Sequence, residues 1–165
     1  MRALTKNRGF SYVEMVFAVA MLALLAAVAT PYLEKNIQRK KESELKQNIR
    51  EIRVAIDNYK SAVDAGKIQK RIGDSGYPHR LQDLVEGVDD ITSPNKTRLR
   101  FLRRIPVDPM YPAQAQNDRP VVPEDTWGKR SYVSDASSPR EGEDVYDVYS
   151  TSAQTGNNGV PYAQW

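Results

Sequence analysis

The sequence predicts an α+β chain in which one long N-terminal helix packs on a small C-terminal domain of short helices and a small antiparallel β-sheet. Every residue from Met15 to Ala29 is apolar, and an apolar residue recurs every three or four positions between Leu45 and Val63. Residues 67–165 are divided by Pro and Gly into short segments. A helical period followed by short, turn-bounded runs is typical of this fold class.

The apolar N-terminal segment is long enough to cross a membrane. Residues 10–33 carry one charge, Glu14, and at ~1.5 Å per residue a helix of this length spans a hydrocarbon core of ~30 Å. The preceding residues 1–9 contain three bases and no acid. We therefore expect a basic leader over 1–9 and a membrane-spanning helix half over 10–33, with the N-terminus in the cytoplasm.

Residues 34–66 are expected to continue the same helix as an amphipathic half. Pro31 removes one backbone hydrogen bond and should kink or loosen the helix, and Gly66 is the natural C-cap. The remaining residues, 67–165, are expected to form a globular domain that covers the apolar seam. The seam consists of Leu45, Ile49, Ile52, Ile56, Tyr59 and Val63.

Composition excludes several classes of function. Three of the 24 basic residues lie in the leader, so the rest of the chain balances its 21 acids and offers no footprint for nucleic acid. The chain has no cysteine, which excludes disulfides and thiolate metal sites. Its single histidine, His79, follows Pro78 and is read as a turn residue. Because no nucleophile–histidine pair or phosphate loop is present, we expect no enzyme.

A secretory signal peptide is the main alternative for the N-terminal segment. Ala27, Val28 and Ala29 form a small-x-small cleavage site, and cleavage there would release a soluble secreted binding domain starting at Thr30. Glu14 resists this interpretation, because a charge at the head of the apolar run hinders insertion. The helical pattern also continues without a break past Ala29.

The residues around Gly9 resemble the processing signal of type IV pilins and type II secretion pseudopilins. Gly9-Phe10-Ser11 is followed by Glu14, behind a short basic leader and ahead of an apolar run. The resemblance implies a pilin-like fold. It also implies that a prepilin peptidase cleaves between Gly9 and Phe10 and that Phe10 becomes N-methylated.

The resemblance also assigns Glu14 to filament assembly. An uncompensated acid in the hydrocarbon costs roughly 2.5–3.5 kcal/mol on insertion scales, so intramembrane acids tend to have partners. The implied partner is the N-terminal amine of Phe10 on a neighbouring subunit. A proline such as Pro31 is also usual in the family, where the segment loosens when subunits pack.

Segments of the C-terminal domain resemble the major pseudopilins of type II secretion systems, the general secretion pathway protein G group. These segments are Gly76-Tyr77-Pro78 with 81–85, then Phe101–Pro109, then Trp127-Gly128 after a proline-bearing insertion at 110–124. We predict a short helix at 81–85, a basic helix at 96–104, and strands at 131–133 and 145–150.

The C-terminal loop of this group commonly binds calcium, and this chain departs from that pattern. Residues 150–162 contain no acid, and calcium usually requires several oxygens that include carboxylates. Ser150, Asn158 and backbone carbonyls are the remaining candidate ligands. We expect no strong calcium site and no other cofactor.

The expected function is that of a pseudopilin, a structural subunit that polymerises into a filament driving protein export by a type II secretion system. The resemblance implies identical subunits, a prepilin peptidase, an inner-membrane secretion platform and minor pseudopilins as partners. It places the subunit in the inner membrane, with its globular domain in the periplasm, and then in a periplasmic or extracellular filament. Two alternatives stay open: a type IV pilin of an adhesion or motility pilus, and the secreted binding domain cleaved after Ala29.

Overall fold

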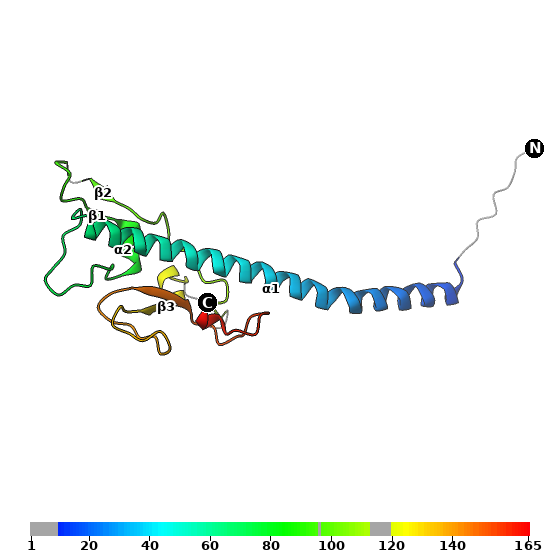
Figure 1. Cartoon of the computed structure of the whole chain (residues 1–165). Coiled ribbons are helices and arrows are strands. Elements are labelled where there is room, and N and C mark those ends of the chain that lie inside the picture. Colours follow the sequence, from blue (N-terminus) through cyan, green and yellow to red (C-terminus); the bar gives the residue numbers. More distant parts are fainter. Residues whose placement is uncertain (1–9, 96, 113–119) are drawn as a thin grey trace, which may run out of the picture. The chain divides into compact units, whose positions relative to one another are not determined.

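The computed structural model describes residues 10–95, 97–112 and 120–165, and the chain divides into two compact units. The first unit extends to Lys40, and the second runs from Lys41 to Trp165. Helix α1, Tyr12–Asp64, contributes residues to both units (Figure 1). The α+β, pilin-like fold class is confirmed, since one long N-terminal helix is followed by short helices and small antiparallel sheets.

In the first unit, the described residues form the N-terminal part of α1 and the two residues before it. Met15 N–H donates to Ser11 O at 3.1 Å, which places Ser11 just before the first helical turn. The helical backbone continues through Pro31. The predicted loosening there is therefore not a break in the helix.

In the second unit, α1 supplies one wall of the hydrophobic core. All six seam residues between Leu45 and Val63 are buried, as predicted, and Ala55 joins them. Burying a side chain of this size stabilises the fold by about 1.5–3 kcal/mol, so the seam is a principal source of its stability. The other core residues are Ile68, Leu81, Leu84, Leu102, Ile105, Met110, Trp127, Val145, Val148 and Tyr162.

Helix α1 ends in the predicted glycine cap. Gly66 has a φ of 71°, a left-handed conformation that costs a glycine little. Gly66 N–H donates to Val63 O at 2.9 Å, and Lys67 N–H donates to Ala62 O at 3.0 Å. This pair of bonds is a Schellman motif, and it satisfies two carbonyls that the helix end leaves open.

The short helix predicted at 81–85 is α2, Leu81–Glu86, with Leu84 packed in the core. Figure 1 shows α2 beside the C-terminal end of α1. Strand β1, Val88–Asp89, follows α2 and pairs antiparallel with β2, Arg98–Leu99. His79 lies in the bend before α2, with Nδ1 2.7 Å from Glu143 O.

The helix predicted at 96–104 is wrong. Within it, residues 98–99 form β2, residues 100–104 are irregular, and Lys96 lies outside the described residues. Phe101 N–H and Leu102 N–H both donate to Leu84 O, at 2.9 and 3.0 Å, so their hydrogen bonds go to α2. A short basic segment gains few helical bonds of its own, and these tertiary bonds replace them.

The second sheet contains β3, Trp127–Arg130, and β4, Asp147–Ser150, paired antiparallel with Trp127 opposite Ser150. β4 confirms the predicted strand at 145–150 over its last four residues. The strand predicted at 131–133 is wrong, because the strand ends at Arg130. Ser131 Oγ and Tyr132 N–H instead donate to Asp144 Oδ1, at 2.6 and 2.9 Å, and hold a turn.

The described residues of the second unit also include two single-turn 3-10 helices. η2, Pro123–Thr126, precedes β3, and η3, Tyr162–Gln164, lies near the C-terminus. η2 closes the predicted proline-bearing insertion, of which residues 113–119 lie outside the described residues.

Candidate functional site

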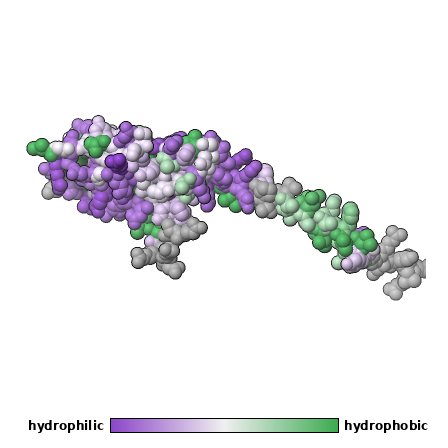
Figure 2. Space-filling model, turned by 90° about the horizontal axis from the view of Figure 1, so that it is seen from below, coloured by the Kyte–Doolittle hydropathy of each residue, from purple (hydrophilic) through white to green (hydrophobic). Residues whose placement is uncertain are grey.

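The first candidate site is the apolar surface of α1 in the N-terminal unit. Figure 2 shows hydrophobic side chains covering this part of the helix on the face in view. α1 is long and apolar enough to cross a membrane, and none of its most apolar window is buried. Soluble monomers rarely leave such a continuous apolar patch open, which makes this surface a candidate for contact with lipid or another protein. The large apolar side chains exposed here include Phe10, Val13, Met15, Val16, Phe17, Val19, Met21, Leu22, Leu24, Leu25 and Leu33.

Glu14 is an exposed carboxylate at the head of this surface. It lies in the first turn of α1, where the partial positive charge of the helix dipole favours an anion. Phe10, which is 80% exposed, lies four residues before Glu14 in the chain, and the two line an apolar hollow with Met15, Phe17 and Ala18. A cation from another molecule can therefore reach the Glu14 carboxylate.

The other residues predicted for processing and assembly are placed less fully. Gly9, on the amino side of the predicted cleavage, lies outside the described residues. Pro31 has a described helical backbone, and its side chain lies outside what the structure describes. Processing between Gly9 and Phe10 therefore remains a prediction from the sequence.

The two candidate calcium ligands are both engaged within the protein. The Ser150 hydroxyl is fully buried and donates to Asp108 Oδ2 at 2.6 Å. The Asn158 side-chain oxygen accepts from Val160 N–H at 3.1 Å. Residues 150–165 also contain no Asp or Glu side chain. This donor set does not fit a calcium site, which needs six to eight oxygen ligands.

Asp108 gives the Phe101–Pro109 segment a structural role that the sequence did not reveal. Its side chain accepts from Ser150 Oγ and, at 2.7 Å, from Met110 N–H, while its own N–H donates to Thr126 Oγ1 at 3.1 Å. Trp127 Nε1 donates to Pro106 O at 2.7 Å. Burial raises the pKa of Asp108 above its usual range, against the lowering effect of the Ser150 and Met110 bonds. These bonds fasten the segment to η2 and β4.

Sequence reasoning missed the polar contacts that join α1 to the C-terminal residues. Arg53 Nε donates to Asp147 Oδ1 at 2.7 Å, and Arg53 Nη2 donates to Trp165 O at 3.0 Å. Arg130 Nη2 also reaches Asp147, at 3.2 Å. The apolar Val148 between Asp147 and Tyr149 could have indicated that Asp147 faces away from the core, because successive strand residues point to opposite faces. No sequence signal marks its pairing with Arg53, 94 residues away.

Two curated proteins resemble the chain in sequence. Over 59 residues, 36% of the chain, it is 37% identical to the type IV major pilin protein PilA of Myxococcus xanthus, and the match covers 27% of that protein. Over 113 residues, 66% of the chain, it is 26% identical to the type II secretion system core protein G of Escherichia coli, and the match covers 70% of that protein. The chain is thus similar to pilins and pseudopilins, and its fold is pilin-like. Both matches and the fold support the pilin and pseudopilin superfamily, as the sequence predicted.

The remaining comparisons add nothing to this assignment. No protein-family model and no solved structure matches the chain. The matched region also spans only about a quarter of the Myxococcus pilin.

Proposed function

We propose that this pilin-like chain is a structural subunit of a helical filament, and more narrowly the major pseudopilin of a type II secretion system. The main support for this proposal is the exposed apolar surface of α1, with the exposed carboxylate of Glu14 at its N-terminal end. Apolar surface of this extent can be buried first in lipid and then between subunits. At about 25 cal/mol per Å² of apolar area, burial between subunits supplies most of the free energy of assembly.

In the proposed mechanism, the subunit waits in the inner membrane, with its leader in the cytoplasm and its globular unit in the periplasm. A prepilin peptidase removes residues 1–9 and exposes the amine of Phe10. Glu14 of the incoming subunit accepts this amine from its neighbour, which offsets the cost of a carboxylate in the hydrocarbon. The secretion platform and minor pseudopilins start the filament, whose growth pushes substrates outward.

The secretion assignment is favoured by the extent of the two similarities. The match to core protein G covers about two thirds of both chains, whereas the match to the pilin covers 59 residues at higher identity. The higher identity keeps a type IV pilin as the second candidate. Deleting the gene in the host separates them: loss of protein export with surface pili intact supports the pseudopilin, and the reverse supports the pilin.

Processing is tested by the intact mass of the mature chain isolated from membranes. We expect a chain that starts at N-methylated Phe10. A chain starting at Thr30 would contradict the filament subunit and support the secreted domain, because cleavage there removes most of the apolar surface.

Assembly is tested with variants of Glu14. Glu14→Ala should lower the filament yield at least about tenfold, while the leader is still removed. A tenfold lower association constant corresponds to a loss of ~1.4 kcal/mol in the free energy of assembly. Glu14→Gln keeps the side-chain shape and its ability to cap the helix start, so an equal loss identifies the charge as the cause. Glu34→Ala, an exposed acid beyond the apolar segment, is the matched control and should assemble normally. Normal yield from both Glu14 variants would remove the amine partner.

A further inference from the structure

Three hydrogen bonds from the C-terminal segment converge on one carboxylate oxygen of α1. Glu42 Oε1 accepts hydrogen bonds from Asn157 N–H at 2.9 Å, from Asn157 Nδ2 at 2.8 Å and from Tyr162 Oη at 2.9 Å. Two of these three donors belong to one residue at the tip of the loop. Hydrogen bonds to an ionised acceptor are roughly twice as strong as neutral ones, so this is a firm attachment point.

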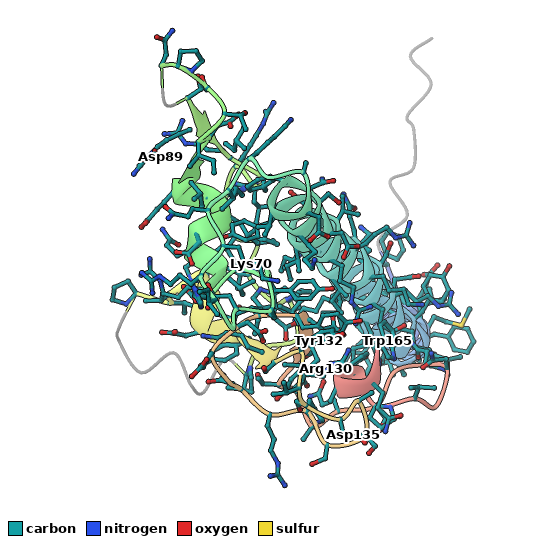
Figure 3. The ribbon with its side chains drawn as sticks, turned by 60° about the vertical axis from the view of Figure 1, so that its left-hand side comes forward. Lys70, Asp89, Arg130, Tyr132, Asp135 and Trp165 are labelled. Atoms are coloured by element: carbon teal, nitrogen blue, oxygen red, sulfur yellow. The ribbon has the colours of Figure 1, made fainter. Side chains whose placement is uncertain are left out.

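The aromatic residues that follow the loop strengthen the attachment. Tyr162 is fully buried and packs edge-on against Trp165, with ring centroids 4.9 Å apart. Lys46, one helical turn after Glu42, places its ammonium 4.4 Å from the centroid of the Trp165 ring. In Figure 3, Trp165 lies beside α1. The carboxylate and the ammonium thus hold the two ends of the same short segment.

The loop between these contacts is closed by its own backbone. Gly156 N–H donates to Val160 O at 3.0 Å, and Tyr162 N–H donates to Gln154 O at 3.1 Å. Gly156 packs so closely on the Trp165 ring that a Cβ there would lie 2.4 Å from Cζ2. The loop therefore has a defined shape, which positions the donor groups that reach Glu42.

We infer that Glu42 holds the C-terminal loop, residues 154–162, in place of the calcium ion that the family resemblance implies. The direction of the hydrogen bonds at Glu42 supports this inference. Three donors direct their hydrogens at one oxygen, whereas a calcium ion needs lone pairs directed at it. The loop and the helix therefore complement each other through hydrogen bonds, and the order of the loop is independent of divalent cations.

The test uses the full-length chain in detergent micelles. Wild-type protein should show the same thermal midpoint and the same hydrogen exchange across residues 154–162 in millimolar calcium and in EDTA. Glu42→Gln removes the charge that gathers the three donors. It should speed amide exchange at Asn157 at least tenfold and lower the midpoint by about 3–8 °C.

Two further variants complete the experiment. Tyr162→Phe removes one donor and keeps the buried ring, so it should cause a smaller change in the same direction and remain measurable if Glu42→Gln fails to fold. Glu44→Gln, an exposed acid two positions along the helix, should match wild type. A midpoint that rises with calcium, or loop exchange that Glu42→Gln and Tyr162→Phe leave unchanged, would overturn the inference.

Discussion

Two buried aspartates in the second unit have pKa values displaced in opposite directions. Burial raises the pKa of Asp108, and its two hydrogen bonds only partly oppose this. Burial also acts to raise the pKa of Asp144, but hydrogen bonds from Ser131, Ser75 and the Tyr132 N–H, with the charge of His79, lower it overall. Folding therefore favours the neutral form of Asp108 and the ionised form of Asp144.

These displacements predict opposite effects of pH on stability. The native state binds the Asp108 proton more tightly than the unfolded state, so this contribution is present below the unfolded pKa and is lost as pH rises through the native pKa. The contribution of Asp144 is present above the unfolded pKa and is lost as pH falls through its lower native pKa.

Urea unfolding between about pH 2 and 7 measures both contributions. In the wild type, Asp108 makes the free energy of unfolding fall as pH rises, and Asp144 makes it fall as pH drops. Asp108→Asn should abolish the first dependence, and Asp144→Asn should abolish the second. Asp125→Asn, at an exposed position in η2, is the control and should keep the wild-type profile. Identical profiles for all three variants would refute the assignment.

At the scale of the element, the seam of α1 determines whether the second unit folds. Ile52→Ala should lower the free energy of unfolding by about 2–5 kcal/mol, because it removes a fully buried side chain and leaves a cavity. Val54→Ala, on the exposed side of the same helix turn, should change it by less than about 0.5 kcal/mol. Both changes raise helix propensity, so equal losses measured by chemical denaturation would show that burial is not the cause.

The elements that the sequence predicted correctly are those with a local signal. The 3–4 spacing of α1, the glycine at its end and the apolar pattern of α2 each act within a few residues, and the structure has all three. These features could be read because neighbouring residues alone determine them.

The elements that were missed depend on distant residues. The segment at 96–104 has helical composition, yet Leu84 O takes two of its N–H groups. The strand at 127–130 contains a glycine and two bases and has weak strand propensity. Gly128 is required because a Cβ there would lie 2.3 Å from the ring of Tyr149 on the paired strand. A contact of this kind has no counterpart in the sequence pattern.

At the scale of the whole molecule, the two units differ in whether their apolar side chains are buried. The core cluster of the described residues begins at Leu45 and includes no residue of the first unit. The apolar residues of the first unit are instead exposed. The chain therefore combines a segment that needs lipid or protein around it with a unit that supplies its own core.

A truncated chain of residues 34–165 tests this division. We expect a monomer that is soluble without detergent and has the thermal midpoint of the full-length chain, because all core residues and Glu42 are retained. Calorimetry and sedimentation measure the two properties. The same fragment with Ile52→Ala should melt lower, which shows that the transition reports on the core. Aggregation of the unchanged fragment would mean that the first unit is needed for folding.

The wide spacing of the contacts in the second unit has a consequence for the order of its folding. The Glu42–Tyr162 bond joins residues 120 positions apart, and the Arg53–Trp165 bond joins residues 112 apart. Contacts between residues so far apart in the sequence form slowly, because a long loop must close before they contribute to stability. The seam of α1 is synthesised before the other residues of the core, of which Tyr162 comes last. The chain therefore carries an incompletely covered apolar helix face during its synthesis, and this period is when it is most exposed to misassembly.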